Sequence, residues 1–223
     1  MTQTRVLGLF AKLPEAGRVK TRLAAATSPE WAAEVARACL LDMIQRLAEV
    51  PAHRVLAYTP TDARPYFDAV AGPGFSLVPQ AEGDLGKRMH TFFSQQLAQG
   101  AEPVVLLGTD SPTLPIGYII EAFDRLEEVD VVLGPALDGG YYLVGCGRDL
   151  PPIFADIPWS TPEVLSATVA RLSQTQHRLA VLPPWYDVDT HADWLMLKGH
   201  LAALRRAGID RCVPHVEALV ADG

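Results

Sequence analysis

Short apolar runs alternate with amphipathic stretches along most of the chain. The apolar runs show little polar alternation, which is typical of strands covered on both faces of a sheet. They predict strands over residues 5–12, 53–60, 75–80, 103–110 and 130–137. In the other stretches apolar side chains recur at helical spacing, which predicts helices over residues 28–50, 61–70, 83–100, 115–129, 161–174 and 190–208.

Capping and turn residues support several of these boundaries. Ser28, which precedes a proline, and also Thr161 and Thr190 are predicted to cap the helices that follow them. Gly100 is a typical residue at the end of a helix. Pro65 is expected to break the short helix over 61–70.

The alternation changes in the last third of the chain. A strand predicted over 139–146 follows the previous one with almost no room for a helix, so we expect it to run antiparallel to a neighbour. A further strand is predicted over 178–189. Residues 209–223 are weakly patterned and fit either a strand-helix tail or a contact with a partner. Strands that alternate with helices predict an α/β fold, here a single domain over 1–223 with a mixed, mostly parallel central sheet flanked by helices.

Composition narrows the classes of function. The 223 residues suffice for a sizeable core, and 49% of them are hydrophobic. A net charge of -7 argues against a nucleic-acid partner, because such partners select basic surfaces. The three cysteines lie far apart in the sequence, and the N-terminal apolar run is too short for a signal peptide or a membrane span. We expect a cytoplasmic protein without nucleic-acid or membrane partners.

The loop after the first strand carries more positive charge than a simple connection needs. The segment "LFAKLPEAGRVKTRLA" places Lys12, Arg18, Lys20 and Arg22 within eleven positions. A local cationic pocket can hold an anion even in an acidic protein. A solvated run of surface charge is the alternative interpretation.

Aspartates stand where three of the predicted strands end. Asp110 ends one strand, Asp138 lies beside two glycines, and Asp187 and Asp189 lie two residues apart. Ligands of open α/β sheets bind beyond the carboxyl ends of the strands, and carboxylates without nearby cysteine or histidine select Mg²⁺ or Mn²⁺. The pattern therefore predicts a metal-bound polyphosphate between these aspartates and the basic loop. Each aspartate taken alone also fits a turn former or a helix cap.

Five segments, taken in order, resemble one known group of proteins. They are "FAKLPEAGRVKTRL", "EGDLGKRM", "GTDSPTLP", "ALDGGYYLVG" and "YDVDT". Together they resemble a family of bacterial glycosyltransferase-like proteins of unassigned substrate in the nucleotide-diphospho-sugar transferase superfamily. The chain is also similar to 2-phospho-lactate guanylyltransferases and molybdenum-cofactor guanylyltransferases. The resemblance runs from Arg5 to about Trp194 and implies a Rossmann-like GT-A fold.

The resemblance also implies roles for particular residues. The implied nucleotide-binding residues are Phe10, Ala11, Lys12, Gly17, Lys20, Arg22, Gln80, Gly83, Asp84, Gly86 and Asp110. The implied acceptor-binding residues are Asp138, Gly139, Gly140 and Tyr141. Asp110 would be the principal metal ligand and Asp189 the second, with Asp187 as the alternative. From the chemistry of phosphoryl transfer we expect Lys20, Arg22, Asp110 and Asp138 to form the catalytic set, with Asp138 as a candidate base if the acceptor is a hydroxyl group.

Two departures from related patterns leave the reaction open. The glycine-rich first loop of sugar-nucleotide pyrophosphorylases is replaced by "FAKLPEAG", and Asp110 is followed by Ser111 and Pro112 instead of completing an aspartate-any-aspartate motif. We favour Mg²⁺-dependent transfer of a nucleotidyl group from a nucleoside triphosphate to a small phosphorylated or hydroxyl acceptor, with release of pyrophosphate. A glycosyltransferase that uses an NDP-sugar is the alternative. A non-catalytic nucleotide-binding protein is a third possibility.

Overall fold

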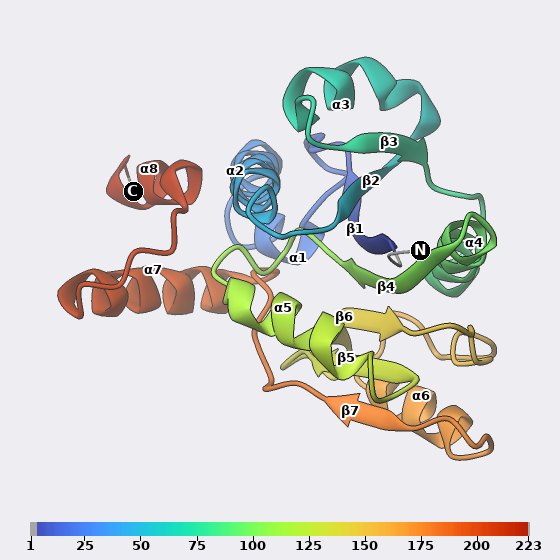
Figure 1. Cartoon of the computed structure of the whole chain (residues 1–223). Helices are drawn as coiled ribbons and strands as arrows, with labels where there is room; N and C mark the ends of the chain where they lie inside the picture. Colours follow the sequence, from blue (N-terminus) through green and yellow to red (C-terminus); the bar gives the residue numbers. More distant parts are fainter. Residues whose placement is uncertain (1–3, 223) are drawn as a thin grey trace.

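One sheet of seven strands runs through the part of the chain that the computed structural model describes, residues 4–222 (Figure 1). The strands are β1 (Thr4–Lys12), β2 (His53–Thr59), β3 (Ser76–Pro79), β4 (Ala101–Leu107), β5 (Val131–Pro135), β6 (Tyr141–Cys146) and β7 (Leu179–Val181). They lie in the order β3-β2-β1-β4-β6-β5-β7. Strand β6 runs antiparallel to β4 and β5, whereas the other pairs are parallel. This confirms the predicted α/β fold with a mixed, mostly parallel sheet.

Helices cover both faces of the sheet. They are α1 (Thr21–Ala24), α2 (Pro29–Leu47), the 3-10 turn η1 (Thr61–Ala63), α3 (Arg64–Ala71), α4 (Leu85–Ala98), α5 (Ile116–Arg125), α6 (Val164–Leu172), α7 (His191–Arg206) and α8 (Pro214–Asp222). Helices α2, α3 and α5 pack on one face, and α4 and α6 pack on the other. Helices α7 and α8 extend this fold on the side of α2 (Figure 1). Within residues 4–222 no helix has the length and apolarity that a membrane crossing requires.

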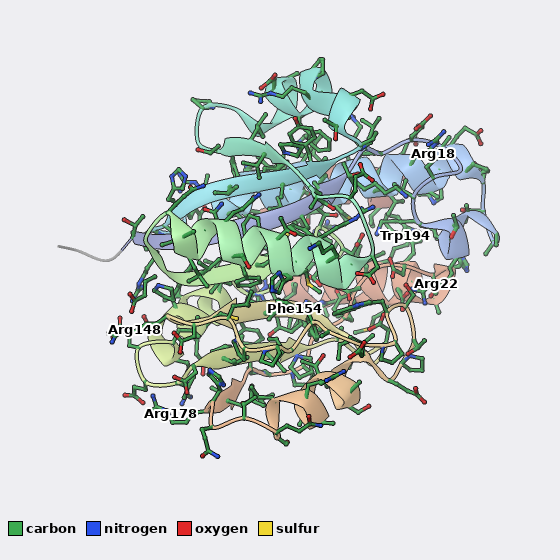
Figure 2. All side chains as sticks on the ribbon, turned by 90° about the vertical axis from the view of Figure 1, so that its right-hand side faces the viewer. Arg18, Arg22, Arg148, Phe154, Arg178 and Trp194 are labelled. Atoms are coloured by element: carbon green, nitrogen blue, oxygen red, sulfur yellow. The ribbon has the colours of Figure 1, made fainter. Side chains whose placement is uncertain are left out.

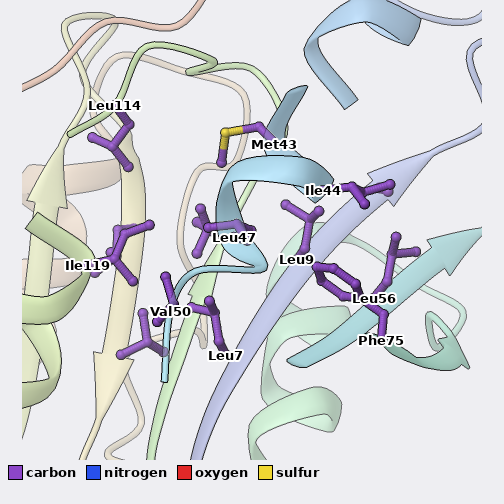
Figure 3. Close-up of a cluster of buried hydrophobic side chains, with 14 of the residues drawn as sticks. Leu7, Leu9, Met43, Ile44, Leu47, Val50, Leu56, Phe75, Leu114 and Ile119 are labelled. Carbon is purple, nitrogen blue, oxygen red and sulfur yellow. The ribbon is translucent and has the colours of Figure 1, made fainter. Parts of the chain in front are cut away.

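Side chains of β1 alternate between the two faces, as a strand buried on both sides requires. Leu7 and Leu9 pack with Met43 and Leu47 of α2 (Figure 3). Val6 belongs to the other core, which α4 closes. The sheet therefore separates two apolar layers, and its strand ends are left for polar groups.

Several predicted helix boundaries are confirmed. Ser28 caps α2, because its side chain accepts a hydrogen bond from the backbone of Trp31. Thr190 and Asp193 form a reciprocal capping box at the start of α7. Gly100 follows α4 with a φ of 85°, a conformation that glycine adopts at little cost.

Other predictions were wrong for identifiable reasons. Helix α6 begins at Val164, and the side chain of Thr161 donates to the Pro158 carbonyl instead of capping that helix. Pro65 stands in the first turn of α3, where a proline is tolerated, so it does not break the helix. Strand β7 has three residues because two prolines follow it at 183–184, and the chain then leaves the sheet.

Helix α2 anchors two distant segments through buried charged residues. Asp42 is fully buried and accepts hydrogen bonds from the backbone of His215 (3.0 Å) and Val216 (2.9 Å) at the start of α8. Arg46, one turn later, is 4% exposed. Its guanidinium donates to the carbonyls of Pro112 and Leu114 in the loop that follows β4. The C-terminal segment is therefore a helix packed on α2, and α2 also holds the loop after β4 in place.

Charged side chains gather at both ends of the sheet. Figure 2 shows Arg18 and Arg22 at one end and Arg148 and Arg178 at the opposite end. At the second end, Arg148 pairs with Glu102, and Arg178 pairs with Asp130. The end that carries Arg22 is the one at which β1 and β4 terminate, and the aspartates meet there.

Candidate functional site

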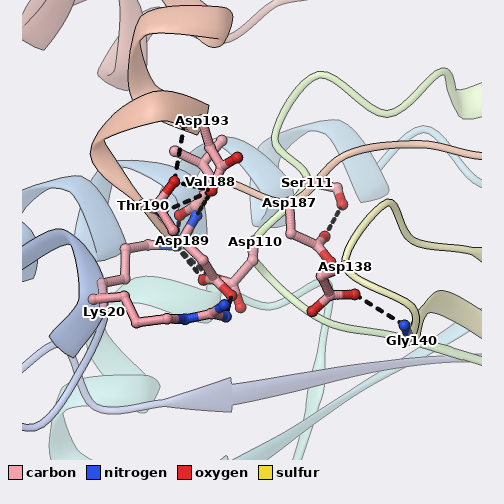
Figure 4. Close-up of polar contacts among 11 residues, drawn as sticks. Lys20, Asp110, Ser111, Asp138, Gly140, Asp187, Val188, Asp189, Thr190 and Asp193 are labelled. Carbon is pink, nitrogen blue, oxygen red and sulfur yellow. Dashed lines mark hydrogen bonds and ion pairs between the residues drawn. The ribbon is translucent and has the colours of Figure 1, made fainter. Parts of the chain in front are cut away.

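Three segments that are distant in the sequence meet beyond the carboxyl ends of β1 and β4 (Figure 4). The loop after β1 carries Lys20, the loop after β4 carries Asp110, and the segment before α7 carries Val188 and Asp189. The backbone N–H of Val188 donates to the Asp110 carbonyl at 2.8 Å. This bond fixes the two aspartate-bearing segments side by side.

Lys20 joins these segments through its side chain. Its Nζ donates to Asp110 Oδ1 and to the Val188 carbonyl (2.6 Å), and it lies 3.7 Å from Asp189 Oδ1. The side chain is 3% exposed. The backbone at Lys20 is left-handed, with a φ of 43°, which is costly for a residue that has a side chain. The contacts of the ammonium group offset this cost.

Charge neighbours decide the ionisation of Lys20. Burial by itself lowers the pKa of the ammonium group, but the carboxylates of Asp110 and Asp189 outweigh that effect, so the net pKa is raised. Lys20 is therefore a cation throughout the physiological range. Arg22 adds a second cation, because its Nη2 donates to Asp189 Oδ2 at 2.7 Å.

Four aspartates gather around these cations, and we call Asp110, Asp138, Asp187 and Asp189 the carboxylate cluster. Burial and the other carboxylates of the cluster raise the pKa of Asp187 to about 7, although a hydrogen bond from Ser111 opposes this shift. Burial and the charge of Asp110 also raise the pKa of Asp189, against the effect of the two nearby cations. The structure thus brings together the aspartates that the sequence placed at strand ends.

Asp138 has a structural contact as well as a place in the cluster. Its Oδ1 accepts a hydrogen bond from the Gly140 backbone at 3.0 Å, which is the turn contact expected of an Asp-Gly-Gly segment. Gly139 has a φ of 91°, and a Cβ there would lie 2.2 Å from the Pro162 carbonyl oxygen. The turn therefore requires glycine and holds Asp138 in a fixed position.

Two cavities adjoin the cluster and share Leu85 and Tyr141 in their walls. The first has a volume of about 310 Å³, and its wall includes Phe10, Ala11, Lys12, Gln80, Arg88 and Asp110. The second has a volume of about 510 Å³, and its wall includes Arg22, Asp138, Trp159, Asp187 and Asp189. The cluster therefore spans the boundary between two ligand-sized spaces.

Four other residues of the predicted nucleotide site do not line the first cavity. Asp84 caps α4 by accepting from the Lys87 backbone at 2.8 Å. A Cβ at Gly86 would lie 2.5 Å from Trp159 Nε1, so glycine allows close packing there. Gly83 and Gly17 have φ values of 117° and 77° and occupy turns. A role of these four in nucleotide binding stays a prediction.

Sequence reasoning missed Arg88. Its Nη1 donates to Gln80 Oε1 at 3.4 Å, while Gln80 donates to the carbonyls of Ala11 and Ala57. Arg88 thus adds positive charge to the wall of the first cavity. A signal was present, because the first turn of α4 carries two basic residues and no acid, the reverse of what the helix dipole favours.

The sequence allows Trp159 and Tyr186 to line a pocket and favours core packing for both. Trp159 lines the second cavity and also packs against one apolar core, whereas Tyr186 is a core residue. It is 7% exposed, and its hydroxyl group contacts Thr113 Oγ1 at 3.0 Å and His200 Nδ1 at 2.7 Å. The two aromatic residues therefore have different surroundings, which local sequence does not distinguish.

The carboxylates of the cluster suit a hard divalent cation whose remaining positions are filled by water and a bound phosphate compound. In residues 4–222 no three histidine, cysteine, aspartate or glutamate side chains are arranged to hold a metal ion by themselves. Asp110 and Asp189 offer two carboxylates on either side of the Lys20 ammonium group. Mg²⁺ commonly uses one or two protein carboxylates and completes its shell with water and phosphate oxygens, so these residues fit it.

Comparisons with known proteins agree with this architecture. A nucleotide-diphospho-sugar transferase candidate from Desulfovibrio desulfuricans G20 is 32% identical, with a TM-score of 0.87 over 99% of this chain and 98% of that one. A cytidylyltransferase from Leptospira borgpetersenii serovar Hardjo-bovis is 12% identical, with a TM-score of 0.61 over 99% of this chain and 94% of the other. A CMP:2-keto-3-deoxy-manno-octonic acid synthetase complexed with CTP is 13% identical, with a TM-score of 0.58 over 90% and 99%. The last two show a shared fold.

A search of the curated proteins finds no match to this sequence. The sequence model of one family, "Uncharacterized protein conserved in bacteria (DUF2064)", matches residues 39–161, which is more than half of the chain. The structural relative from Desulfovibrio is similar over nearly the whole length. The chain belongs to this family of bacterial proteins, DUF2064.

Proposed function

We propose that the protein is a Mg²⁺-dependent nucleotidyltransferase that transfers a nucleotidyl group from a nucleoside triphosphate to a small acceptor. The observation that carries this proposal is that Lys20 contacts both Asp110, which lines the first cavity, and Asp189, which lines the second. A nucleoside would occupy the first cavity. Its phosphates would extend toward Asp110, and the acceptor would enter from the second cavity.

Electrostatics explain why a metal ion belongs in this proposal. A polyphosphate that approached the cluster alone would meet four carboxylates and the two cations that pair with them, Lys20 and Arg22. The net charge of that surface is negative, so it would repel the ligand. Mg²⁺ held by Asp110 and Asp189 would reverse this balance and neutralise charge that develops on the phosphates.

The protein's own residues would position the reactants. Lys20 and Arg22 hold the two ligand carboxylates in position through their contacts with Asp110 and Asp189, and Lys12 and Arg88 add positive charge to the wall of the first cavity. An acceptor oxygen would bond to the α-phosphorus while the bond to the β-phosphate oxygen breaks, and pyrophosphate leaves. If the acceptor is a hydroxyl group, Asp138 would take its proton.

The comparisons support nucleotide chemistry in different ways. The Leptospira protein is named a cytidylyltransferase, and the synthetase structure is a complex with CTP. The name of the Desulfovibrio protein, which is 32% identical, favours a second candidate function. In that case the donor is an NDP-sugar, and the acceptor attacks the sugar instead of the phosphorus.

A ligand-dependent stability measurement tests the proposal. The melting temperature would be recorded with each of the four common nucleoside triphosphates and with NDP-sugars, with and without Mg²⁺. A donor present at 100 times its Kd stabilises the fold by about 2.7 kcal/mol, so the true donor should stand out when Mg²⁺ is present. The variant Asp110→Ala should lose this Mg²⁺-dependent gain. The variant Asp68→Asn, on the exposed side of α3, should retain it.

Contacts of the cations give a graded second test. Lys20→Ala and Arg22→Ala should each weaken triphosphate binding by about 1–3 kcal/mol, the scale of a lost charge-assisted hydrogen bond. Unchanged binding of metal and nucleotide in Asp110→Ala, Lys20→Ala and Arg22→Ala would contradict the proposed site. Product analysis then separates the two candidate reactions: release of pyrophosphate indicates nucleotidyl transfer, and release of a nucleoside diphosphate indicates glycosyl transfer.

A further inference from the structure

The charge around the second cavity restricts what the acceptor can be. Three carboxylates line it, those of Asp138, Asp187 and Asp189, and the lining includes one cation, Arg22. Arg22 is already bound to Asp189 Oδ2 at 2.7 Å, and its side chain is 61% exposed. Even with Asp189 assigned to the metal, two carboxylates remain that face the space where an acceptor would lie.

Hydrogen bonds of these two carboxylates leave acceptor capacity unused. Asp138 Oδ1 accepts from the Gly140 backbone, and Asp187 Oδ1 accepts from Ser111 Oγ. Each aspartate therefore retains a second oxygen that can accept a hydrogen bond from a ligand hydroxyl group. A phosphate or carboxylate group offers no hydrogen to these oxygens when it is ionised, and it would add a like charge.

Aromatic and hydroxyl side chains form the rest of the wall. Trp159 packs edge to face on Tyr141, with ring centroids 6.4 Å apart, and both residues line the cavity with Ser160 and Thr161. A Cβ on Gly86 would also lie 2.6 Å from the Phe154 carbonyl oxygen, so Gly86 allows this wall to pack close to α4. The cavity therefore combines an apolar aromatic surface with hydrogen-bond acceptors, which suits the C–H and O–H groups of a polyol.

We propose that the acceptor is an uncharged hydroxyl compound, a sugar or another polyol, and that the second cavity discriminates against phosphorylated and carboxylated acceptors. This inference rests on the proposed function and names its acceptor class. It applies equally to nucleotidyl transfer and to the NDP-sugar reaction, because both need an acceptor oxygen to enter from the second cavity. In nucleotidyl transfer the hydroxyl oxygen bonds to the α-phosphorus as pyrophosphate leaves, and in the NDP-sugar reaction it bonds to the sugar as the nucleoside diphosphate leaves. In both reactions the hydroxyl proton passes to Asp138.

The expected discrimination follows from the charges. A phosphate charge about 5 Å from one carboxylate costs about 3 kcal/mol at the effective dielectric constant of a protein surface, which corresponds to a factor of about 100 in affinity. This factor counts one carboxylate, that of Asp138.

The test uses matched pairs of acceptors on the complete protein. Once the melting experiment has identified the donor, the complex with Mg²⁺ and a non-hydrolysable analogue of that donor is titrated in a calorimeter. The titrants are glycerol and glycerol 3-phosphate, glucose and glucose 6-phosphate, and myo-inositol and its 1-phosphate. Turnover with the natural donor is measured for the same pairs. At least one neutral compound should bind and react about 100-fold better than its phosphate ester.

Variants of the cavity wall test the cause of the discrimination. Asp138→Asn should narrow the affinity ratio between a neutral compound and its ester by about 10-fold or more, since it removes one charge and keeps the shape. Trp159→Ala should weaken binding of the neutral compound without changing the affinity for the donor, and Trp159→Phe should restore part of it.

The outcomes separate this inference from the proposed function. If no nucleotide or NDP-sugar binds, the proposed function fails before any acceptor is tested. If a donor binds and a phosphate ester, or a cationic amine, is preferred over the neutral compounds, the inference is overturned while the function stands. If a donor binds and no member of any pair does, the assignment of the second cavity to an uncharged polyol is overturned as well.

Discussion

Replacing Lys20 with methionine removes the ammonium group that holds three segments together and keeps the length of the side chain. In the variant Asp110 and Asp189 would face each other without the cation between them, and the Val188 carbonyl would lose the hydrogen bond that it accepts at 2.6 Å. The left-handed backbone at position 20 would remain and would no longer be offset. We therefore expect a less stable fold.

The expected loss of unfolding free energy follows from how deeply Lys20 and its two aspartate partners are buried. Removing one partner of a fully buried ion pair costs about 3–5 kcal/mol. Lys20 is almost fully buried, but the side chains of Asp110 and Asp189 are 44% and 29% exposed, so water solvates part of the charge that is left behind. The lost hydrogen bond to Val188 adds about 1 kcal/mol. We expect the variant to lose about 2–3 kcal/mol of unfolding free energy.

Urea denaturation at pH 7 with EDTA, followed by tryptophan fluorescence and circular dichroism, measures this loss. The dependence on urea concentration should keep its slope, so that the shift in midpoint reports stability. Lys12→Met is the matched control, because Lys12 is exposed and donates to the Arg18 carbonyl, and it should change stability by less than about 0.5 kcal/mol. A loss for Lys20→Met no larger than for the control, or strict additivity with Asp110→Asn, would refute the reasoning.

Three further predictions concern other residues of the site. Arg46→Met removes the donor that fixes the loop after Asp110, so it should cost about 2–4 kcal/mol in urea denaturation and weaken Mg²⁺-dependent nucleotide binding; intact binding in a destabilised variant would limit Arg46 to folding. Gly86→Ala should cost about 1–3 kcal/mol through overlap with the wall of the second cavity, whereas Gly117→Ala, where a Cβ meets nothing within 4 Å, should be neutral or stabilising. The pKa of Asp187, about 7 in the folded state, exceeds its ordinary value, so the folded state binds the extra proton and stability should fall as pH rises from about 4 to about 7. Asp187→Asn should flatten that dependence in metal-free buffer, and an unchanged slope would contradict the assignment.

The position of the carboxylate cluster could be predicted from the order of strands and the aspartates that follow them. Parallel strands end at one edge, so Asp110 and the basic loop had to lie near each other once the strands were recognised. Asp187 and Asp189 follow a three-residue strand by several residues. The hydrogen bond from the Val188 backbone to the Asp110 carbonyl places them in the cluster. The location of the cluster was therefore predictable, but the contact that completes it was not.

The burial of individual site residues could not be predicted from the local sequence. Lys20 and Arg18 look alike in the basic loop, yet Lys20 is 3% exposed and Arg18 is an exposed partner of Glu15. The difference arises from the segment before α7, which is more than 160 residues away in the sequence. The same limit applies to Trp159 and Arg88, whose roles depend on which elements pack against them.

Asp42 and Arg46, the two buried charged residues of α2, contact α8 and the loop that carries Asp110. Asp42 and Arg46 stand on successive turns of α2, so one helix supports both segments. Deleting residues from Pro214 onward would strip Asp42 of both amide donors and leave its carboxylate unsatisfied inside the protein. Designers of shortened or C-terminally fused versions should therefore treat α8 as part of the framework behind the carboxylate cluster and monitor ligand binding as well as yield.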